Sequence, residues 1–388
     1  MSIHQTRQFL SASSRRSSPQ ETATFTVMTY NILAQCLTRR RLYPYASKKA
    51  LKLATRQRLL QEQLQAMNPS IACLQEVDNL NNWTRLFREL KYGYLYCQHP
   101  LKQHGCCIIY KQELFELSGY KEVDLDEVGK VGEPSDAHPP ASGMTKTMAQ
   151  ILALRWKEHQ GKGIIISNHH LFWPPLAAYE KLRQACVVLE SCVSMGLEYQ
   201  WPVLMCGDFN STPESAVYCS LTGHTVTEKG MKELDTIPSN YFPQEDEERD
   251  SIMDEESKVK LGLLSPQALL DRMASLPRAT SAYGQYVDVD TEASNDWAVS
   301  GEPRWTNYTE WKGTLDYIFQ VALEGIEPLV LQGLLKLPTE DMLLPGLPND
   351  QWGSDHLCLM AEYAKPLGQV DTKPENGDDA KGKGALGA

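Results

Sequence analysis

The chain has 388 residues, of which 42% are hydrophobic and 22% charged, and its formal net charge is −11. These proportions are those of a globular protein, and no apolar run approaches the roughly 20 residues that a membrane helix needs. The acidic balance argues against a protein that coats nucleic acid nonspecifically, because such binding depends on neutralising phosphates.

The N-terminal segment, residues 1–23, precedes the first strand-like run. Its first 20 residues combine arginines with many serines and contain no acid, which fits a mitochondrial presequence and a disordered segment equally well. We expect 1–23 to be disordered and the protein to be cytoplasmic or nuclear, with a mitochondrial location left open.

Apolar runs of strand length recur along the chain, with helical patterns between some of them. The runs are FTVMTY at 25, IACLQ at 71, CCIIY at 106, AQILAL at 149, GIIISNH at 163, VLMCG at 203, LDYIF at 315 and LCLMAEY at 357. The ten cysteines form no C-x-x-C pair, so we expect buried free thiols in a reducing compartment. The sequence predicts a mixed α/β fold.

Two segments depart from this pattern. Residues from about 243 to 300 carry an acidic run and few strand signals, which indicates an insertion rather than a second domain. Residues 365–388 are too polar and glycine-rich to build a core and are expected to be disordered. A single domain over 24–364 remains.

A basic segment lies near the start of this domain. From Arg39 to Arg58 there are eight basic residues and no acid, interleaved with Tyr43 and Tyr45. Such a run is most often a solvated face, but it could also attract a polyanion.

Polar residues with chemical potential follow or precede the strand-like runs, where α/β sheets usually gather their active sites. They are Asn31, Glu76, His170, Asp208, Asn210 and the cluster Ser354, Asp355 and His356. Each short motif taken alone is usually a turn. Together their oxygen atoms suit one or two Mg²⁺ ions, with Mn²⁺ as a substitute, and Mg²⁺ keeps water ligands for a substrate phosphate. The set therefore favours a phosphodiester hydrolase.

Taken in order, the motifs YNILAQ, CLQEVD, NHHLFW, GDFNSTP, TLDYIF and SDHL resemble the endonuclease/exonuclease/phosphatase superfamily. These motifs, together with WTNYT at 305–309, are most similar to those of poly(A) deadenylases of the carbon-catabolite-repressor type and of their nocturnin, angel and fungal Ngl relatives. The resemblance implies two mixed β-sheets packed face to face and flanked by helices, with 24–364 as the catalytic domain.

The resemblance also implies roles. Glu76, Asn31, Asn210 and Asp355 would hold metal; Asp208 would orient the attacking water; and His170 would contact the scissile phosphate. His356 would stabilise the transition state, paired with Asp316. Asn307 and Trp311 would hold and stack the 3′-terminal base. Relatives often have an acid where this chain has His104, which weakens any expectation that poly(A) is the preferred substrate.

The activity implied is that of a 3′–5′ exoribonuclease that acts on single-stranded RNA 3′ ends and releases 5′-mononucleotides. A phosphatase of a nucleotide cofactor such as NADP and a non-catalytic RNA-binding protein are the alternatives. Leucine-rich repeats, through which larger deadenylases join their complex, are absent, so membership of that complex is not implied. We expect a monomer with no membrane partner.

Overall fold

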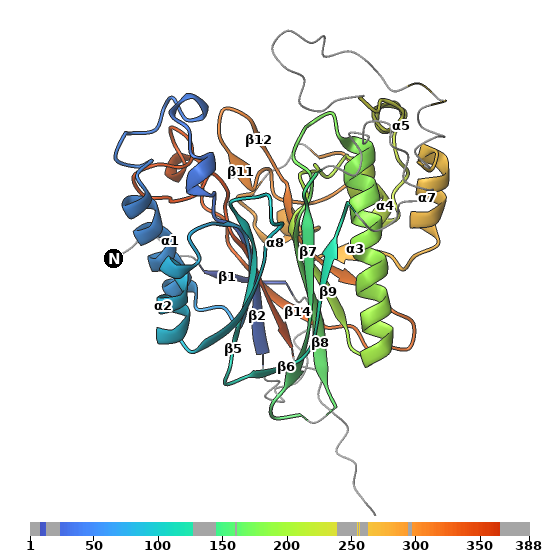
Figure 1. Cartoon of the computed structure of the whole chain (residues 1–388), viewed down its shortest axis with the longest axis horizontal. Helices are drawn as coiled ribbons and strands as arrows, with labels where there is room; N and C mark the ends of the chain where they lie inside the picture. Colours follow the sequence, from blue (N-terminus) through green and yellow to red (C-terminus); the bar gives the residue numbers. More distant parts are fainter. Residues whose placement is uncertain are drawn as a thin grey trace, which may run out of the picture.

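Two β-sheets and their covering helices make up the fold in the computed structural model, which describes residues 8–12, 24–126, 145–159, 161–238, 254, 256, 263–293 and 297–364. The seven-stranded sheet has the order β1-β14-β15-β2-β3-β5-β4 and the six-stranded sheet the order β10-β13-β9-β8-β7-β6, while β11 and β12 form a separate hairpin (Figure 1). The fold is the one that the sequence motifs imply.

The strands of the seven-stranded sheet are β1 (Phe9–Ser11), β2 (Thr24–Asn31), β3 (Ile71–Val77), β4 (Tyr92–Cys97), β5 (Gly105–Lys111), β14 (Val330–Leu335) and β15 (Leu359–Ala364). Those of the six-stranded sheet are β6 (Phe115–Asp124), β7 (Met148–Trp156), β8 (Gly163–His170), β9 (Val203–Asp208), β10 (Ala279–Ser281) and β13 (Asp316–Val321). The hairpin consists of β11 (Asn307–Tyr308) and β12 (Lys312–Gly313).

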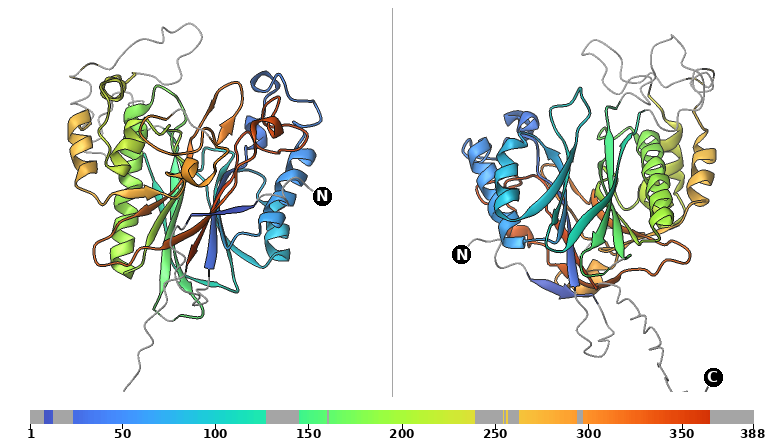
Figure 2. Two further views of the ribbon diagram at one scale, coloured as in Figure 1. Left: turned by 180° about the vertical axis from the view of Figure 1, so that it is seen from behind. Right: turned by 60° about the horizontal axis from the view of Figure 1, so that its bottom comes forward.

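The helices lie outside the two sheets. Helices α1 (Leu53–Met67) and α2 (Asn81–Glu89) cover one sheet, while α3 (Ala178–Tyr199), α4 (Ala216–Thr222), α5 (Glu228–Asp235) and α7 (Pro266–Ala274) cover the other, as both views in Figure 2 show. The short helix α8 (Tyr286–Val289) follows β10.

Two connections of the same kind set the direction of the central strands. Strands β2 and β3 pair in parallel across α1, and β8 and β9 pair in parallel across α3, whereas the other pairings are antiparallel. Parallel neighbours need such a crossover, and their carboxyl ends meet at one edge. The structure therefore brings four chain segments with polar C-terminal residues to the same end of the sheets.

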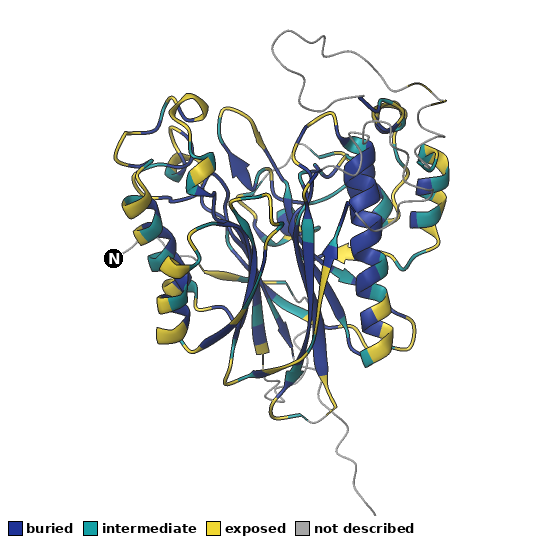
Figure 3. Ribbon diagram, viewed as in Figure 1, coloured by how far each residue is buried: buried dark blue, intermediate teal, exposed yellow. Residues whose placement is uncertain are grey.

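The core has three layers. Apolar residues such as Phe25, Trp156 and Ile318 fill the space between the sheets, and separate clusters join each sheet to its helices. Figure 3 shows the buried strands and the exposed outer faces of α1, α2 and α7. Since both sheet faces are covered, the strands read as continuous apolar runs rather than as alternating ones.

Two segments that the sequence set apart from the main pattern contain regular structure. Residues 8–12 lie in the segment 1–23 that we expected to be disordered, yet β1 pairs with β14. The expected insertion at 243–300 includes β10, which pairs with β13, and α7, whose Leu269 and Met273 are buried. The two strands are only three residues long, which is too short to give a recognisable pattern in the sequence. Residues 365–388 lie outside the described residues.

The cysteine and membrane expectations can be compared directly with the structure. All ten cysteines are free and nine are buried, while Cys36 is exposed. Within the described part of the chain, no helix has the length and apolar character needed to cross a membrane.

Candidate active site

Six strand ends place the candidate residues at one end of the two sheets. Strands β2, β3, β8 and β9 finish at this end, while β13 and β15 begin there because they run antiparallel to β9 and β2. Asp208 pairs in register with His170 on one side and with Asp316 on the other. Side chains that are far apart in sequence therefore face a common centre.

Asn31 joins the two central carboxylates. Its Nδ2 donates to Glu76 Oε1 at 3.1 Å and to Asp208 Oδ2 at 3.0 Å. The backbone N–H of Leu33 donates to Asn31 Oδ1 at 3.0 Å, which fixes the orientation of the amide. Ala34 N–H donates to Glu76 Oε2 at 2.9 Å. Asn31 thus positions both carboxylates through its nitrogen, and one lone pair of its oxygen is already used.

The backbone at the site is strained. Glu76, Leu33 and Asn210 have φ values of 58°, 55° and 47°, in the left-handed region that side-chain-bearing residues rarely adopt. Such outliers persist where the surrounding structure over-determines them, and they cluster at functional sites. The side chain of Asn210 is fixed by a hydrogen bond from its Nδ2 to Leu171 O at 2.8 Å. This bond uses the amide nitrogen and not the side-chain oxygen.

Asp355 enters the site from the segment before β15. Tyr43 O–H donates to Asp355 Oδ2 at 2.8 Å, and Ser354 Oγ donates to Asn31 O at 2.6 Å. Burial, followed by the charge of Glu76, raises the pKa of Asp355 above its ordinary value. Sequence reasoning missed the contribution of Tyr43, although it noted this tyrosine within the basic segment.

Asp316 and His356 form a buried pair. His356 Nδ1 and Asp316 Oδ2 are 2.8 Å apart, and Thr306 Oγ1 donates to the same oxygen at 2.6 Å. Although burial alone would lower it, the pKa of His356 is raised well above its usual value by Asp316 and Asp208. His356 Nε2 lies 3.7 Å from Asp208 Oδ2. The pair therefore presents a protonated imidazole to the centre of the site.

His170 faces the same two carboxylates from β8. Its Nε2 lies 3.5 Å from Asp208 Oδ2 and its Nδ1 3.9 Å from Glu76 Oε1. Burial would raise the pKa values of Glu76 and Asp208, but His170 and other polar neighbours hold both below their usual values. The adjacent His169 points to the opposite face, where burial lowers its pKa to about 3. His169 is therefore a neutral core residue, and its ring packs against Phe209.

The hairpin residues lie at the side of this cluster. Asn307 forms a β-bridge with His356, and Tyr308 N–H donates to Asp355 O at 3.0 Å. Asn307 is buried, whereas Trp311 is 50% exposed. A Cβ added at Gly313 would lie 2.5 Å from the Trp311 ring, so the ring lies against this glycine. Trp311 is therefore a half-exposed aromatic side chain fixed on the hairpin that adjoins His356.

Two lysines and a histidine lie on the other side, and sequence reasoning singled out only His104 among them. Lys102 and His104 in the turn before β5 and Lys146 before β7 line a narrow cleft together with Glu76 and His170. Burial lowers the pKa values of Lys102 and His104. The departure from the family pattern at His104 was the available signal.

A polar bridge below the site connects the two sheets. Gln75 Nε2 donates to Asn168 Oδ1 at 2.8 Å, and Asn168 Nδ2 donates to Leu74 O and Cys107 O at 3.0 and 3.1 Å. Buried amides that are satisfied in this way rigidify a core. The bridge fixes the separation between the strand ends that carry Glu76 and His170.

The donor set fits a hard divalent cation. Asp208, Asp316 and His356 each offer a ligand atom within 4.8 Å of the others, and the Glu76 and Asp208 oxygens converge on one Asn31 nitrogen. Oxygen donors of this kind suit Mg²⁺ or Mn²⁺ rather than zinc. The predicted ligands Glu76, Asn31, Asn210 and Asp355 are the residues that would hold it, and Asp208 lies beside Asn31 and Asn210.

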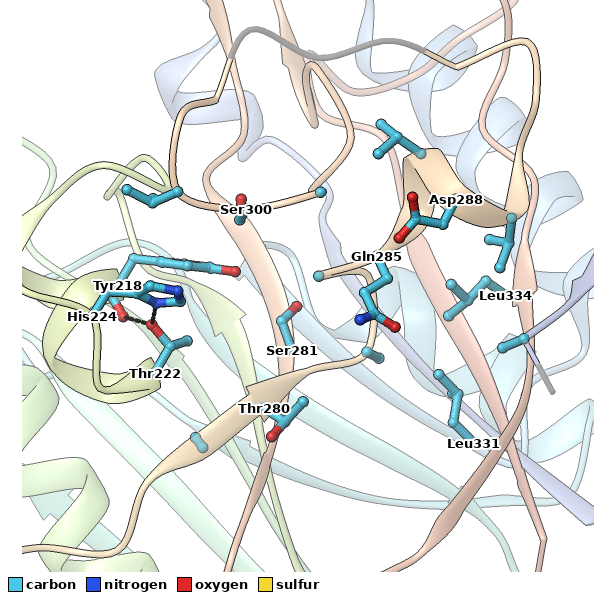
Figure 4. A pocket seen from close by; sticks show the side chains of 18 residues that line it. Tyr218, Thr222, His224, Thr280, Ser281, Gln285, Asp288, Ser300, Leu331 and Leu334 are labelled. Atoms are coloured by element: carbon cyan, nitrogen blue, oxygen red, sulfur yellow. Dashed lines mark hydrogen bonds between the residues drawn. The ribbon is translucent and has the colours of Figure 1, made fainter. Parts of the chain in front are cut away.

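A more spacious cavity lies elsewhere in the described part of the chain. Its volume is about 650 Å³, and its wall includes Tyr218, Thr222, His224, Thr280 and Gln285 (Figure 4). None of the candidate residues lines it. The close-up shows a hydrogen bond between Thr222 and His224 but no converging carboxylates. The candidate catalytic and metal-binding residues therefore lie at the strand ends and not in this cavity.

Comparisons with known proteins agree with this geometry. The probable RNA exonuclease NGL3 of Saccharomyces cerevisiae is 30% identical over 397 residues, covering 88% of this chain and 77% of that protein. Human 2′,5′-phosphodiesterase 12 is 29% identical over 363 residues, covering 88% of this chain and 52% of that protein. This chain therefore spans about half the length of the human relative.

A solved structure and a family model complete the comparison. The crystal structure of ANGEL2, a 2′,3′-cyclic phosphatase, in complex with adenosine-2′,3′-vanadate has a TM-score of 0.66 at 23% identity, covering 92% of this chain and 98% of that one. That likeness concerns the fold alone. The model of the Endonuclease/Exonuclease/phosphatase family matches residues 28–356, a span that includes every candidate residue from Asn31 to His356, and this chain therefore belongs to that family.

Proposed function

We propose that this protein is a metal-dependent phosphodiesterase that removes nucleotides from the 3′ ends of single-stranded RNA and releases 5′-mononucleotides. The observation that carries the proposal is the convergence of Glu76, Asp208 and the Asp316–His356 pair at a centre flanked by Trp311. The names of the curated relatives, RNA exonuclease and phosphodiesterase, support the same reaction class.

The side chains divide the work of hydrolysis. Trp311 stacks the 3′-terminal base and Asn307 holds it, which places the last phosphodiester beside His170 and His356. Asp208 accepts a hydrogen bond from the attacking water and orients it in line with the 3′ oxygen that leaves. The protonated His356, held by Asp316, stabilises the negative charge that develops on the phosphoryl oxygens. A bound Mg²⁺ would supply further charge neutralisation and acidify a coordinated water.

A labelled-RNA time course tests this proposal. We expect 5′-labelled single-stranded RNA to give a ladder that shortens from the 3′ end in Mg²⁺ and to stay intact in EDTA. Adenosine and mixed 3′ ends, compared in the same assay, rank the preferred tail. Intact RNA in saturating Mg²⁺ would contradict the proposal.

Two further substrates and a binding assay separate the alternatives. Phosphate release from NADP that is faster than RNA hydrolysis would move the protein to the nucleotide phosphatases. Cleavage of 2′,5′-linked oligoadenylate in preference to the 3′,5′ isomer would assign the linkage named in the human relative. RNA binding without any turnover would identify a non-catalytic RNA-binding protein.

Replacement of Trp311 by alanine is expected to raise KM for RNA about tenfold, because base stacking is worth roughly 1–3 kcal/mol. The value of kcat should change less, since the half-exposed ring holds the base and takes no part in the chemical step. Trp173, which is 60% exposed, provides a comparison with another surface tryptophan. Steady-state kinetics on an oligoadenylate measure both, and an unchanged KM for Trp311→Ala would exclude the stacking role.

The exposed arginines of the basic segment should act on association. Arg39 and Arg41 are exposed, whereas Arg40 donates to Pro44 O at 3.0 Å and Arg56 is buried. We expect Arg39→Ala with Arg41→Ala to raise KM for long RNA more than it lowers kcat and to flatten the dependence of KM on salt. Salt titration of kcat/KM measures this, and an unchanged salt slope would contradict it.

A further inference from the structure

Each central strand of one sheet faces a strand of the other sheet across the site, and we call each such facing pair a lane. From one side to the other, the seven-stranded sheet presents β15, β2, β3 and β5, and the six-stranded sheet presents β13, β9, β8 and β7. The lanes therefore run from Asp316 and His356, through Asn31 and Asp208, to Glu76 and His170. The last lane, between the starts of β5 and β7, holds His104 and Lys146.

The last lane is cationic. Lys102, His104 and Lys146 line its cleft with Glu76 and His170. Among the residues that the structure describes, none of the side-chain nitrogens of Lys102, His104 and Lys146 has a hydrogen-bond or ion-pair partner. In a chain of net charge −11, two lysines and an imidazole that can donate a hydrogen bond, placed together beside the reaction centre, point to an anionic ligand.

The lane is also structurally fixed. Lys146 has φ 56°, and its backbone N–H donates to Asp126 Oδ2 at 2.6 Å, while Thr145 Oγ1 donates to Asp126 Oδ1 at 2.7 Å. The buried Asp126 thus holds Lys146 in a strained conformation at the mouth of the cleft. The cleft has a volume of about 20 Å³, which suits one water. The flexible lysine side chains must therefore swing aside to admit a larger anion.

The two sides of the centre take different parts of a nucleic acid. Trp311 and Asn307 lie at the His356 side, so a 3′-terminal base stacked there leaves its phosphodiester over the middle lanes. Neighbouring lanes are about 4.8 Å apart. One or two lanes further on, the strand reaches Lys102, His104 and Lys146, a separation on the scale of one nucleotide step.

We propose that Lys102, His104 and Lys146 form a subsite for the phosphate one nucleotide upstream of the scissile phosphate. This inference rests on the proposed exonuclease activity, which it extends by naming a substrate class: strands that carry at least one phosphate 5′ to the bond that is cut. The subsite holds the penultimate nucleotide, whose 3′ oxygen is the leaving group, in place while the bond breaks.

Two dinucleotides isolate this contact. ApA has only the scissile phosphate, whereas pApA adds the upstream phosphate as a 5′-monophosphate. We expect kcat/KM for pApA to exceed that for ApA by roughly tenfold, since a charge-assisted hydrogen bond is worth about 1.5–3 kcal/mol and 1.4 kcal/mol is tenfold. Lys102→Met should bring this ratio towards one, and His104→Asp, which places an acid in the subsite, should lower it at least as far.

Lys111→Met is the matched control, because Lys111 is similarly half-buried but lies at the opposite end of β5. It should leave the ratio of wild type. A ratio near one in wild type, or a ratio that Lys102→Met and His104→Asp both leave unchanged, would overturn the subsite. Failure of the wild type to cleave ApA, pApA and longer RNA would instead overturn the proposed exonuclease, so the two failures are distinguishable.

Discussion

Glu76→Gln is expected to lower kcat/KM on single-stranded RNA by at least about a thousandfold, because it removes the central negative charge that a divalent cation needs. The pKa of Glu76 lies below its usual value, so the carboxylate is ionised throughout the neutral range. Glutamine has nearly the same shape, but its NH₂ would face either the Asn31 amide or the Ala34 N–H, both of which donate. The measurement is kcat/KM across a Mg²⁺ titration.

The control for this experiment is Glu62→Gln. Glu62 forms an exposed ion pair with Arg58 on α1, at 2.7 Å, and exposed pairs of this kind contribute little. Its activity and thermal midpoint should match those of wild type. If Glu76→Gln retained a tenth of the wild-type activity at saturating Mg²⁺ while remaining folded, Glu76 would not be the principal metal ligand.

Much of this site could be predicted from where polar residues interrupt apolar runs. Asn31, Glu76, His170 and Asp208 follow runs that are buried on both faces, and the carboxyl ends of parallel strands meet at one edge. Asp355 and His356 could be singled out because they directly precede the last strand-like run. Asp316 was harder to place, because it is the first residue of β13 and not a polar residue after a strand, and its assignment came from the resemblance to the family.

The supporting contacts could not be predicted, because they join segments that only the fold brings together. Tyr43 reaches Asp355 across 312 positions of the chain. The lane of Lys102 and Lys146 depends on β5 and β7 belonging to different sheets that pack face to face. Strand β10 could not be predicted either, since three residues are too few to form a pattern.

Asp316→Asn is expected to reduce kcat at neutral pH by roughly a hundredfold to a thousandfold, which is the scale on which loss of a buried carboxylate partner disables a histidine. Asp316 is fully buried, and its charge is the main cause that raises the pKa of His356 against the effect of burial. Without that charge the pKa of His356 falls, so the imidazole loses its proton as the pH rises towards neutrality. The same substitution leaves the side-chain volume unchanged.

The pH dependence of kcat should differ between wild type and Asp316→Asn in a defined direction. In wild type the activity that depends on protonated His356 persists above pH 6.5, because the raised pKa keeps the proton in place. In Asp316→Asn the alkaline limb of kcat should move to lower pH, and part of the activity should return on acidification. Thr306→Val removes one hydrogen bond to Asp316 and keeps the charge, so it should lower kcat with little movement of that limb. An alkaline limb at the same pH in Asp316→Asn and wild type would mean that His356 does not act as the protonated group.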